Sequence, residues 1–326
     1  MIVTRTPLRI SIAGGGSDLP SYYRRFGGEL ISAAIDKYVF IGINKRFRDQ
    51  YLIKYSKYEE VCTIDEINHP IVREALRLHE VGPAIEIVSM ADIPAGTGLG
   101  SSGSFTVGLL RALYAMQRCP VTAEQVASEA CRIEIDLLRQ AVGKQDQYIA
   151  SYGGITHFRF NPDDTVDVSP LHISNATLSD LEENLLLFFT GYSRAATDIL
   201  NDQNQRTAQS DGEMLENLHF TKEIGLQIME ALEAGETERF GALMHEHWLN
   251  KQRRSSNMSN NAINRWYNVG RDSGAVGGKM VGAGGGGFLL FYTHNRTQLR
   301  KAMKLEGLPE VPFRFDHDGS MTIVRG

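Results

Sequence analysis

A glycine- and serine-rich segment, PAGTGLGSSGS at 94–104, is the part of the sequence with the clearest chemical potential. It follows an alternating, strand-like stretch at 84–93 and precedes a stretch at 105–116 whose apolar residues recur at helical spacing. A glycine-rich loop between a strand and a helix directs backbone N–H groups at one point, and the helix N-terminus adds positive potential there. The segment therefore predicts a phosphate site, to which Ser101, Ser102 and Ser104 could add hydroxyl donors or a Mg²⁺ ligand.

Two established phosphate-binding patterns do not match this chain. GxxxxGK[ST] is absent, because near Lys279 the required glycine is Ser273. GxGxxG fails because Gly96-Thr97-Gly98 is followed by Leu99-Gly100-Ser101. A tight turn that needs glycines at positive φ is the alternative reading, but seven small residues in nine positions exceed what a turn requires.

Length and composition limit what surrounds this loop. The 326 residues suggest about two domains. The formal net charge of −5 argues against a broadly basic nucleic-acid-binding surface. Three cysteines without CxxC spacing fit a reducing compartment, and no apolar run reaches the length of a membrane span. We therefore expect a cytoplasmic protein with neither a nucleic-acid nor a membrane partner.

Periodicity indicates mixed strands and helices in the first half and mostly helices in the second. Thr122 and Gln125 form a capping box that begins a helix expected over 122–140. A buried strand is expected at 185–191, and helices at 211–234, 236–252 and 259–272. VPFRF and MTIV, joined through DHDG, predict a closing hairpin.

Three motifs in order resemble the GHMP kinases, the superfamily of galactokinase, mevalonate kinase and homoserine kinase. PAGTGLGSS at 94–102 is similar to their phosphate loop, RTPLRISIAGGGSDL at 5–19 to their N-terminal sugar-kinase motif, and GGKMVGAGGGGF at 277–288 to their C-terminal glycine motif. GKQDQY at 143–148 matches the galactokinase-type segment with the catalytic aspartate. The resemblance covers residues 5–291.

The resemblance implies a two-domain α+β fold. Its N-terminal domain is of ribosomal-protein type with a left-handed βαβ unit, and its C-terminal domain is ferredoxin-like. The expected domains are 1–170, with the phosphate loop and catalytic aspartate, and 171–326. ATP and the substrate would meet in the cleft between them, and Mg²⁺ would accompany ATP.

The resemblance also assigns roles to individual residues. Asp146 would accept the proton of the attacking hydroxyl, and Arg9 would lie beside it; a non-catalytic acid at a helix end is the alternative for Asp146. Ser102 and Glu134 would bind Mg²⁺, the alternative for Glu134 being a solvated helix position. The ATP phosphates would contact the loop residues Pro94, Gly96, Thr97, Gly98, Leu99, Gly100, Ser101 and Ser102.

Asp18, with Ser17 and Gly16, matches the part of the family that binds sugar hydroxyls. Galactokinases have Glu-His where this chain has Gly15-Gly16, which makes galactose doubtful. AGGGSDLPSYY, GYSRAATDIL at 191–200 and the FDHDGS ending are more similar to bacterial heptose kinases. Those enzymes phosphorylate the anomeric hydroxyl of D-glycero-D-manno-heptose 7-phosphate during the synthesis of nucleotide-activated heptose.

A substrate phosphate would need a cation, because arginine binds phosphate with two parallel hydrogen bonds. Arg194 is the first candidate, followed by Arg24, Arg25 and Lys37, each of which could equally be an ordinary surface charge. A fucose- or galactose-like substrate and a non-catalytic ATP- and sugar-binding sensor remain alternatives. The expected partner is a small sugar or sugar phosphate, and the chain is a monomer or homodimer.

Several other residues are expected to have no role in chemistry. His245 and His247 lie two positions apart on a helix and so face different sides, which disfavours a shared metal. Trp248 and Trp266 are expected in packing positions. Lys144 could lie near the phosphates, but a lysine beside a helix end is expected to be solvated.

Overall fold

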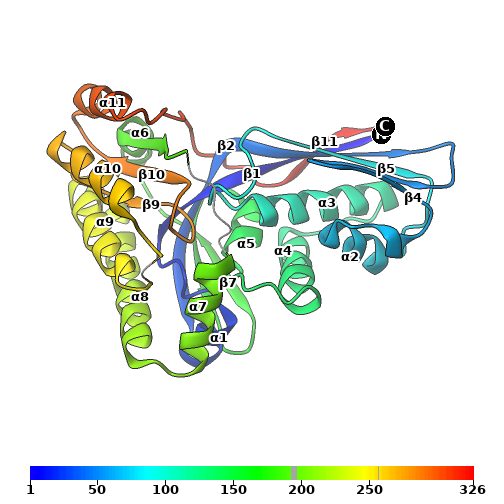
Figure 1. Ribbon diagram of the computed structural model, residues 1–326, viewed down its shortest axis with the longest axis horizontal. Helices are drawn as coiled ribbons and strands as arrows, with labels where there is room; N and C mark the ends of the chain where they lie inside the picture. Colours follow the sequence, from blue (N-terminus) through cyan, green and yellow to red (C-terminus); the bar gives the residue numbers. More distant parts are fainter. Residues whose placement is uncertain (192–196, 256) are drawn as a thin grey trace.

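The computed structural model describes residues 1–191, 197–255 and 257–326. Two long antiparallel strands, β1 (Ile2–Ala13) and β2 (Gly28–Lys45), form the axis of the larger sheet and run along most of the molecule (Figure 1). The order of that sheet is β11-β1-β2-β5-β3-β4, and β6 joins β2 and β7. Its other strands are β3 (Tyr51–Lys54), β4 (Tyr58–Val61), β5 (Ile85–Ala91), β6 (Ile155–Phe160), β7 (Val166–Pro170) and β11 (Met321–Arg325).

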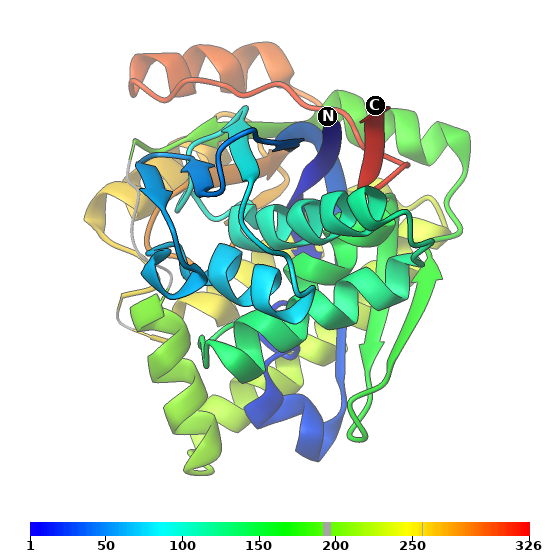
Figure 2. The same ribbon diagram turned by 90° about the vertical axis from the view of Figure 1, so that its right-hand side faces the viewer.

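Helices cover one face of this sheet. The central one is α3 (Ser101–Gln117), which packs on β1 and β2. Its neighbours α2 (Pro70–Leu78) and α4 (Ala123–Cys131) lie on the same side (Figure 2), and α5 (Gln145–Tyr152) packs between α3, α4 and β1. Alanines and leucines of α3 are fully buried against the strands, which fixes the helix and therefore the loop that precedes it. The short α1 (Pro20–Phe26) and the single turn Ile64–Glu66 complete this half.

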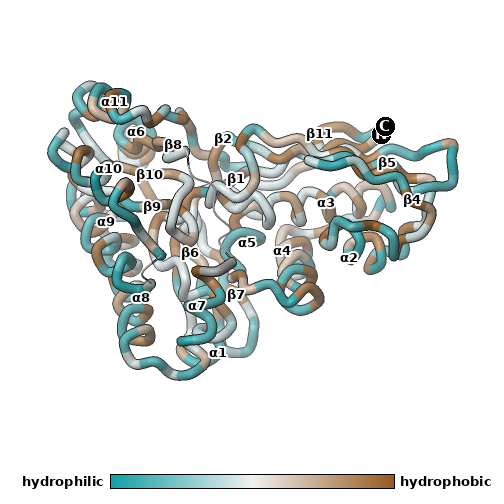
Figure 3. The backbone as a smooth tube through the Cα atoms, in the orientation of Figure 1, coloured by the Kyte–Doolittle hydropathy of each residue, from teal (hydrophilic) through white to brown (hydrophobic). Residues whose placement is uncertain are grey.

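The second half of the chain surrounds a three-stranded antiparallel sheet of order β8-β10-β9. These strands are β8 (Leu185–Phe189), β9 (Gly277–Met280) and β10 (Phe288–Tyr292), and they are buried almost throughout. Figure 3 shows β8 and β10 mainly in white and brown, whereas hydrophilic positions gather on the outer helices. Those helices are α6 (Asn175–Asn184), α7 (Thr197–Ala208), α8 (Gly212–Glu233), α9 (Thr237–Gln252), α10 (Asn261–Asp272) and α11 (Arg296–Leu305).

Packing joins the two halves. Helix α8 contacts both β1 and β2, while α9 lies against α8 and β9. Trp248 of α9 is fully buried, and Trp266 of α10 is partly buried against the same apolar cluster, so both tryptophans serve in packing as expected. The two-domain α+β fold expected from the sequence is confirmed.

The last strand departs from the expected closing hairpin. MTIV does not pair with VPFRF; instead β11 pairs antiparallel with β1, and Phe315 makes only a single bridge to Ile35. The reason lies in the connecting turn, where the Asp316 carboxylate accepts the backbone N–H groups of Asp318 and Gly319 and directs the chain towards β1. The final strand therefore belongs to the first sheet, and the division at 170/171 stays a prediction.

The helix expected over 122–140 is also interrupted. Its capping box at Thr122 is present, but α4 ends at Cys131 and a π-helical turn follows over Arg132–Leu137. The Leu138 N–H donates to the Ile133 carbonyl, five residues back, at 3.0 Å. A π turn holds an extra residue, so both Ile133 and Glu134 face the interior.

None of the helices in the described part of the chain is long and apolar enough to cross a membrane.

Candidate active site

The phosphate loop connects β5 to α3, as the sequence predicts. Gly96, Gly98 and Gly100 all have positive φ, and Gly100 is the residue directly before the first turn of α3. The loop lies at a cavity of about 220 Å³ lined by Gly96, Gly98, Gly100, Ser101 and Ser102. Such a loop presents backbone N–H groups and the positive end of the helix to an anion.

Pro94, Thr97 and Leu99 are not among the residues that line the cavity, and they shape the loop instead. The Thr97 hydroxyl donates to the Pro94 carbonyl at 2.9 Å, and the Leu99 side chain is buried in the core. These residues fix the path of the backbone between the three glycines.

The glycine motif at 277–288 packs directly on this loop. A Cβ on Gly98 would stand 3.0 Å from the Val281 carbonyl oxygen, and a Cβ on Gly282 would collide with the backbone of Gly98. Gly287 meets the Thr97 carbonyl in the same way. The second motif therefore lets two backbones approach closely, which holds the phosphate loop against the second half of the chain.

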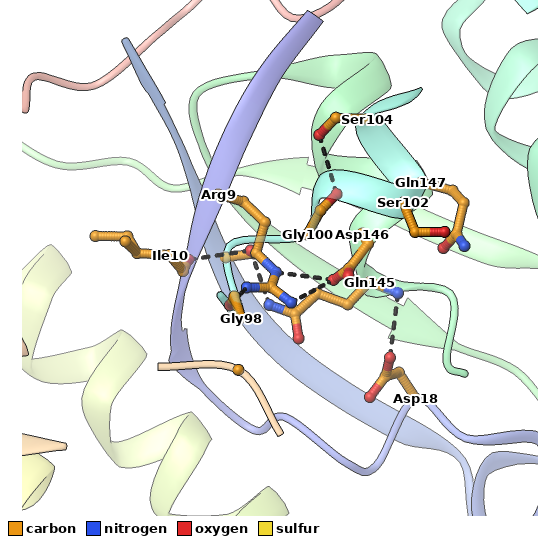
Figure 4. Close-up of polar contacts among 12 residues, drawn as sticks. Arg9, Ile10, Asp18, Gly98, Gly100, Ser102, Ser104, Gln145, Asp146 and Gln147 are labelled. Atoms are coloured by element: carbon orange, nitrogen blue, oxygen red, sulfur yellow. Dashed lines mark hydrogen bonds and ion pairs between the residues drawn. The ribbon is translucent and has the colours of Figure 1, made fainter. Parts of the chain in front are cut away.

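Asp146 lies in the first turn of α5 and is held by Arg9 of β1 (Figure 4). Its Oδ1 accepts hydrogen bonds from both Nε and Nη2 of Arg9, each at 2.8 Å. Arg9 also donates from Nη1 to the Gly98 carbonyl, so one guanidinium links the aspartate to the phosphate loop. Gly103 allows the close approach, since a Cβ there would be 2.7 Å from the Asp146 Cβ. Within the described chain, Oδ2 has no partner and remains available to a ligand.

Glu134 is buried rather than solvated, with 1% of the residue exposed. Its Oε2 accepts the Ser102 hydroxyl, and its Oε1 accepts the Gln147 side-chain N–H at 2.9 Å. Burial raises the pKa of the Glu134 carboxyl, and these hydrogen bonds oppose that rise. The π-helical turn therefore brings a carboxylate to the hydroxyl at the start of α3, and both are oxygen ligands of the kind Mg²⁺ takes. The described residues hold no cluster of three or more potential metal-ligating side chains.

Asp18 faces the same cavity from the turn after β1. Its Oδ1 accepts the Gly16 N–H at 2.9 Å. Its Oδ2 accepts the Gln145 N–H at 3.1 Å (Figure 4). Burial raises the pKa of the Asp18 carboxyl, and the nearby charge of Asp146 acts in the same direction. Gly16 lines the cavity, but Ser17 is fully buried and its hydroxyl bonds the backbone of its own turn and of β2.

Three of the four cations considered for the substrate phosphate do not line the cavity. Arg194 lies outside the described residues. Arg24 pairs with Asp164, Arg25 donates to the backbone and side chain at the end of α7, and Lys37 pairs with Asp36; none of the three lines the cavity. These three expectations are therefore corrected.

Lys144 is also placed differently from the expectation. Instead of being solvated, it is buried and donates to the Asp164 carbonyl at 2.8 Å, away from the phosphate loop. The face of Tyr23 lies 4.8 Å from its ammonium group. Lys144 therefore stabilises the packing around α1 and α5.

Four other basic side chains line the cavity instead, and sequence reasoning gave none of them a role at the site. They are His247 and Lys251 of α9, Arg254 just beyond its end, and Lys279 of β9. All four are buried. The sequence pattern that could have indicated them is the spacing of His247, Lys251 and Arg254. They lie three to four residues apart, as on one side of a helix that continues just past α9. Because basic residues near a helix end are usually solvated, that pattern alone did not mark a site.

Burial shifts the ionisation of these groups. It lowers the pKa of Lys279 to about 7, with the charges of Arg254 and Arg9 adding to the effect. It also lowers the pKa values of Lys251 and His247 well below their usual range. The cavity thus disfavours the charged forms of these side chains, and an anion bound beside them would favour their protonation.

Comparison with known proteins agrees with this geometry. Residues 69–154 match the model of the GHMP kinases N-terminal domain and residues 228–307 that of the GHMP kinases C-terminal domain. The D-glycero-alpha-D-manno-heptose 7-phosphate kinase of Campylobacter jejuni is 30% identical, over 98% of this chain and 97% of its own length.

Two solved structures extend the comparison. The structure of a D-glycero-D-manno-heptose 1-phosphate kinase from Bacteroides thetaiotaomicron is 25% identical, covers 100% of both chains and has a TM-score of 0.81. Lactococcus lactis galactokinase, solved with galactose, shares the fold at 15% identity and a TM-score of 0.76, over 98% of this chain and 94% of its own. Two family models matched in order, and a relative similar along nearly its whole length, show that this chain belongs to the GHMP kinases and is a phosphotransferase.

Proposed function

We propose that this protein is an ATP-dependent sugar kinase that phosphorylates the anomeric hydroxyl of a sugar phosphate. D-glycero-D-manno-heptose 7-phosphate is the first candidate, giving the 1,7-bisphosphate for nucleotide-activated heptose synthesis. The observation that carries the proposal is the Arg9–Asp146 pair, which lies between the phosphate loop and the turn that holds Asp18. The heptose phosphate kinase of Campylobacter jejuni supports the choice of sugar.

In this proposal, Asp146 and Arg9 divide the work at the reacting hydroxyl. Oδ1 of Asp146 is occupied by Arg9, so Oδ2 accepts the proton as the sugar oxygen attacks the γ-phosphorus of ATP. Arg9 keeps the carboxylate in place and adds positive charge next to the loop that would hold the phosphates. Asp18, fixed by two backbone N–H groups, would accept hydrogen bonds from sugar hydroxyls.

We also propose that Ser102 and Glu134 hold Mg²⁺ when MgATP binds. Their oxygens already meet, and Gln147 fixes the second oxygen of the carboxylate. Bound there, Mg²⁺ would neutralise charge on the phosphate oxygens. Because Mg²⁺ takes one or two protein oxygens together with phosphate oxygens and water, the pair is sufficient.

A panel of acceptors tests the substrate. ADP release would be measured with D-glycero-D-manno-heptose 7-phosphate, unphosphorylated heptose, heptose 1-phosphate, fucose, galactose and mannose. The proposal expects the highest kcat/KM with the 7-phosphate and a product whose new phosphorus couples to the anomeric proton in NMR. A higher kcat/KM with fucose or galactose would replace the substrate, and tight sugar binding without any turnover would indicate a sensor.

A further inference from the structure

The basic side chains of the cavity form a cluster, Lys251, Arg254 and Lys279, that the phosphoryl-transfer machinery described above does not use. All three are at most 5% exposed. They come from separate elements, the C-terminal end of α9 and strand β9, and meet beneath the turn that follows β1. Buried cations are costly unless an anion compensates them, so a cluster of three requires an explanation.

With Lys251 and Lys279 protonated, the cavity lining has two positive charges more than negative ones. The carboxylates in its lining are Asp18 and Asp146, and Asp146 is paired with Arg9. The negative charge of Asp18 favours the charged form of Arg254, so these two groups compensate each other. Among the described residues, Lys251 and Lys279 have no carboxylate partner. A phosphate monoester dianion would supply the two negative charges that the protonated lysines need.

Each cation also has one donor left over within the described chain. Lys251 donates to the Met280 and Gly282 carbonyls, and Lys279 contacts the Ile12 carbonyl and His247 Nδ1. An ammonium group has three N–H donors, so one remains on each lysine. Arg254 uses four of its five donors, on Asn217, Gly15, Gln203 and Thr221. Three spare N–H groups on three cations suit the three terminal oxygens of a phosphate group.

Arg254 places the cluster on the acceptor side of the cavity. Its Nη1 donates to the Gly15 carbonyl at 3.0 Å, in the turn that carries Asp18. A Cβ on Gly16 would be 2.5 Å from that nitrogen and 2.9 Å from Gln203 Nε2. The pair Gly15-Gly16, where galactokinases have Glu-His, therefore provides the space that the guanidinium occupies. The nucleotide phosphates have other donors, in the loop and at the N-terminus of α3.

We propose that Lys251, Arg254 and Lys279 bind the non-reacting phosphate of the acceptor, so that the enzyme selects sugars that already carry a phosphate. This inference rests on the proposed function, because it assumes a sugar acceptor next to Asp146. It replaces Arg24, Arg25 and Lys37 with three residues that the fold brings together, while Arg194 stays a prediction.

Binding measurements with neutral variants test the cluster. Lys251→Met and Lys279→Met keep length and remove charge, and Arg253→Met is the matched control because Arg253 is the exposed neighbour of Arg254. Calorimetric titration with D-glycero-D-manno-heptose 7-phosphate should show each cluster variant weakened about 10- to 100-fold, with the control unchanged. Affinity for a non-hydrolysable ATP analogue should stay the same in all three. Lys251→Arg should restore most of the sugar-phosphate affinity.

Equal weakening of the nucleotide would overturn the proposal and assign the cluster to ATP. Unchanged sugar-phosphate affinity in both lysine variants would also overturn it.

A second probe separates this inference from the proposed function. With the phosphate loop filled by the ATP analogue, inorganic phosphate should still bind to the wild type and not to Lys251→Met. If no sugar phosphate binds to the wild type but this phosphate site is found, the proposed substrate is wrong and the anion site stands. If sugar phosphates bind and are phosphorylated but inorganic phosphate binding is insensitive to Lys251→Met, the cluster is not the site.

Discussion

The two ends of the cavity are built in opposite ways. At the phosphate loop, residues of one short segment, Gly96 to Ser102, present backbone N–H groups, and the helix they begin is fixed by its own apolar face. At the cation cluster, single side chains of α9 and β9 meet the turn after β1, across more than 200 positions of sequence. The first end can be recognised in any chain that has the motif. The second depends on tertiary contacts, and it is where we expect related kinases to differ in substrate.

The largest effect should come from the group shared by both ends. Asp146→Asn keeps the shape and removes the charge, so turnover should fall about 10²- to 10⁴-fold with nearly unchanged ATP affinity. Steady-state kinetics and nucleotide titration would measure this, with Asp49→Asn, an exposed carboxylate, as the control. Turnover near the wild-type level would show that the reaction proceeds by positioning and charge alone.

An intermediate effect is expected at the nucleotide end. Glu134→Gln keeps the size and polarity of a buried side chain, but it removes the carboxylate next to Ser102 and turns one of two accepting oxygens into a donor. We expect turnover to fall about 10- to 100-fold and the Mg²⁺ concentration for half-maximal activity to rise. The unfolding midpoint should not fall, because burial raises the pKa of this carboxyl and so disfavours its charged form. Glu223→Gln, at an exposed position of α8, is the control. An unchanged Mg²⁺ titration would remove Glu134 from the metal site.

A smaller effect should appear at the acceptor end. Gly16→Ala places a methyl group against Arg254, and φ at this position is +103°. The KM for the sugar phosphate should rise about tenfold, as expected when one charge-assisted hydrogen bond is weakened, and the KM for ATP should not change. Gly212→Ala is the matched control, since nothing lies within 4 Å of a Cβ there. A rise in the KM for ATP instead would show that the two ends of the cavity do not bind their ligands independently.

The smallest effect concerns stability and pH. Burial lowers the pKa of Lys279 to about 7 in the folded chain, against 10.5 for a free lysine. Between about pH 7 and pH 10.5 the unfolded chain binds more protons than the folded chain. The stability contribution of neutral Lys279 is therefore fully present above pH 10.5 and is lost as the pH falls towards 7. The free energy of unfolding should rise from pH 7 to 8.5, by up to about 1.4 kcal/mol per pH unit from this group.

Denaturant unfolding in a buffer without phosphate measures this slope. Lys279→Met should reduce it, and added inorganic phosphate should flatten it by favouring the charged lysine. An unchanged slope in Lys279→Met would show that other groups cause the pH dependence.

Residue patterns within short segments predicted the features that depend on neighbouring residues alone. The strand, loop and helix around residues 94–104 follow from residue spacing and glycine content, and the structure confirms them. The resemblance brought Asp146, Arg9 and Asp18 to attention, and the structure places all three at one cavity, although their roles stay predictions.

Long-range contacts decided the rest. Whether MTIV pairs with VPFRF or with β1 depends on how the Asp316 carboxylate holds the turn, and strand propensity is the same in both cases. Lys251 and Arg254 resemble any basic helix end until β9 and the turn after β1 enclose them. Residue spacing within α9 cannot predict the burial of these side chains, because the burial depends on three separate parts of the chain.

The π-helical turn at Arg132–Leu137 makes the position of Glu134 sensitive to the length of the chain. Such a turn contains one residue more than an α-helical turn. Deleting Arg132 would restore an α-helix and rotate Glu134 by about 100° relative to α4, away from Ser102. A substitution leaves the number of residues in the helix unchanged, so it does not rotate Glu134 in this way. A chain of this fold with an uninterrupted α-helix here would therefore have to bring a carboxylate to the start of α3 from another position.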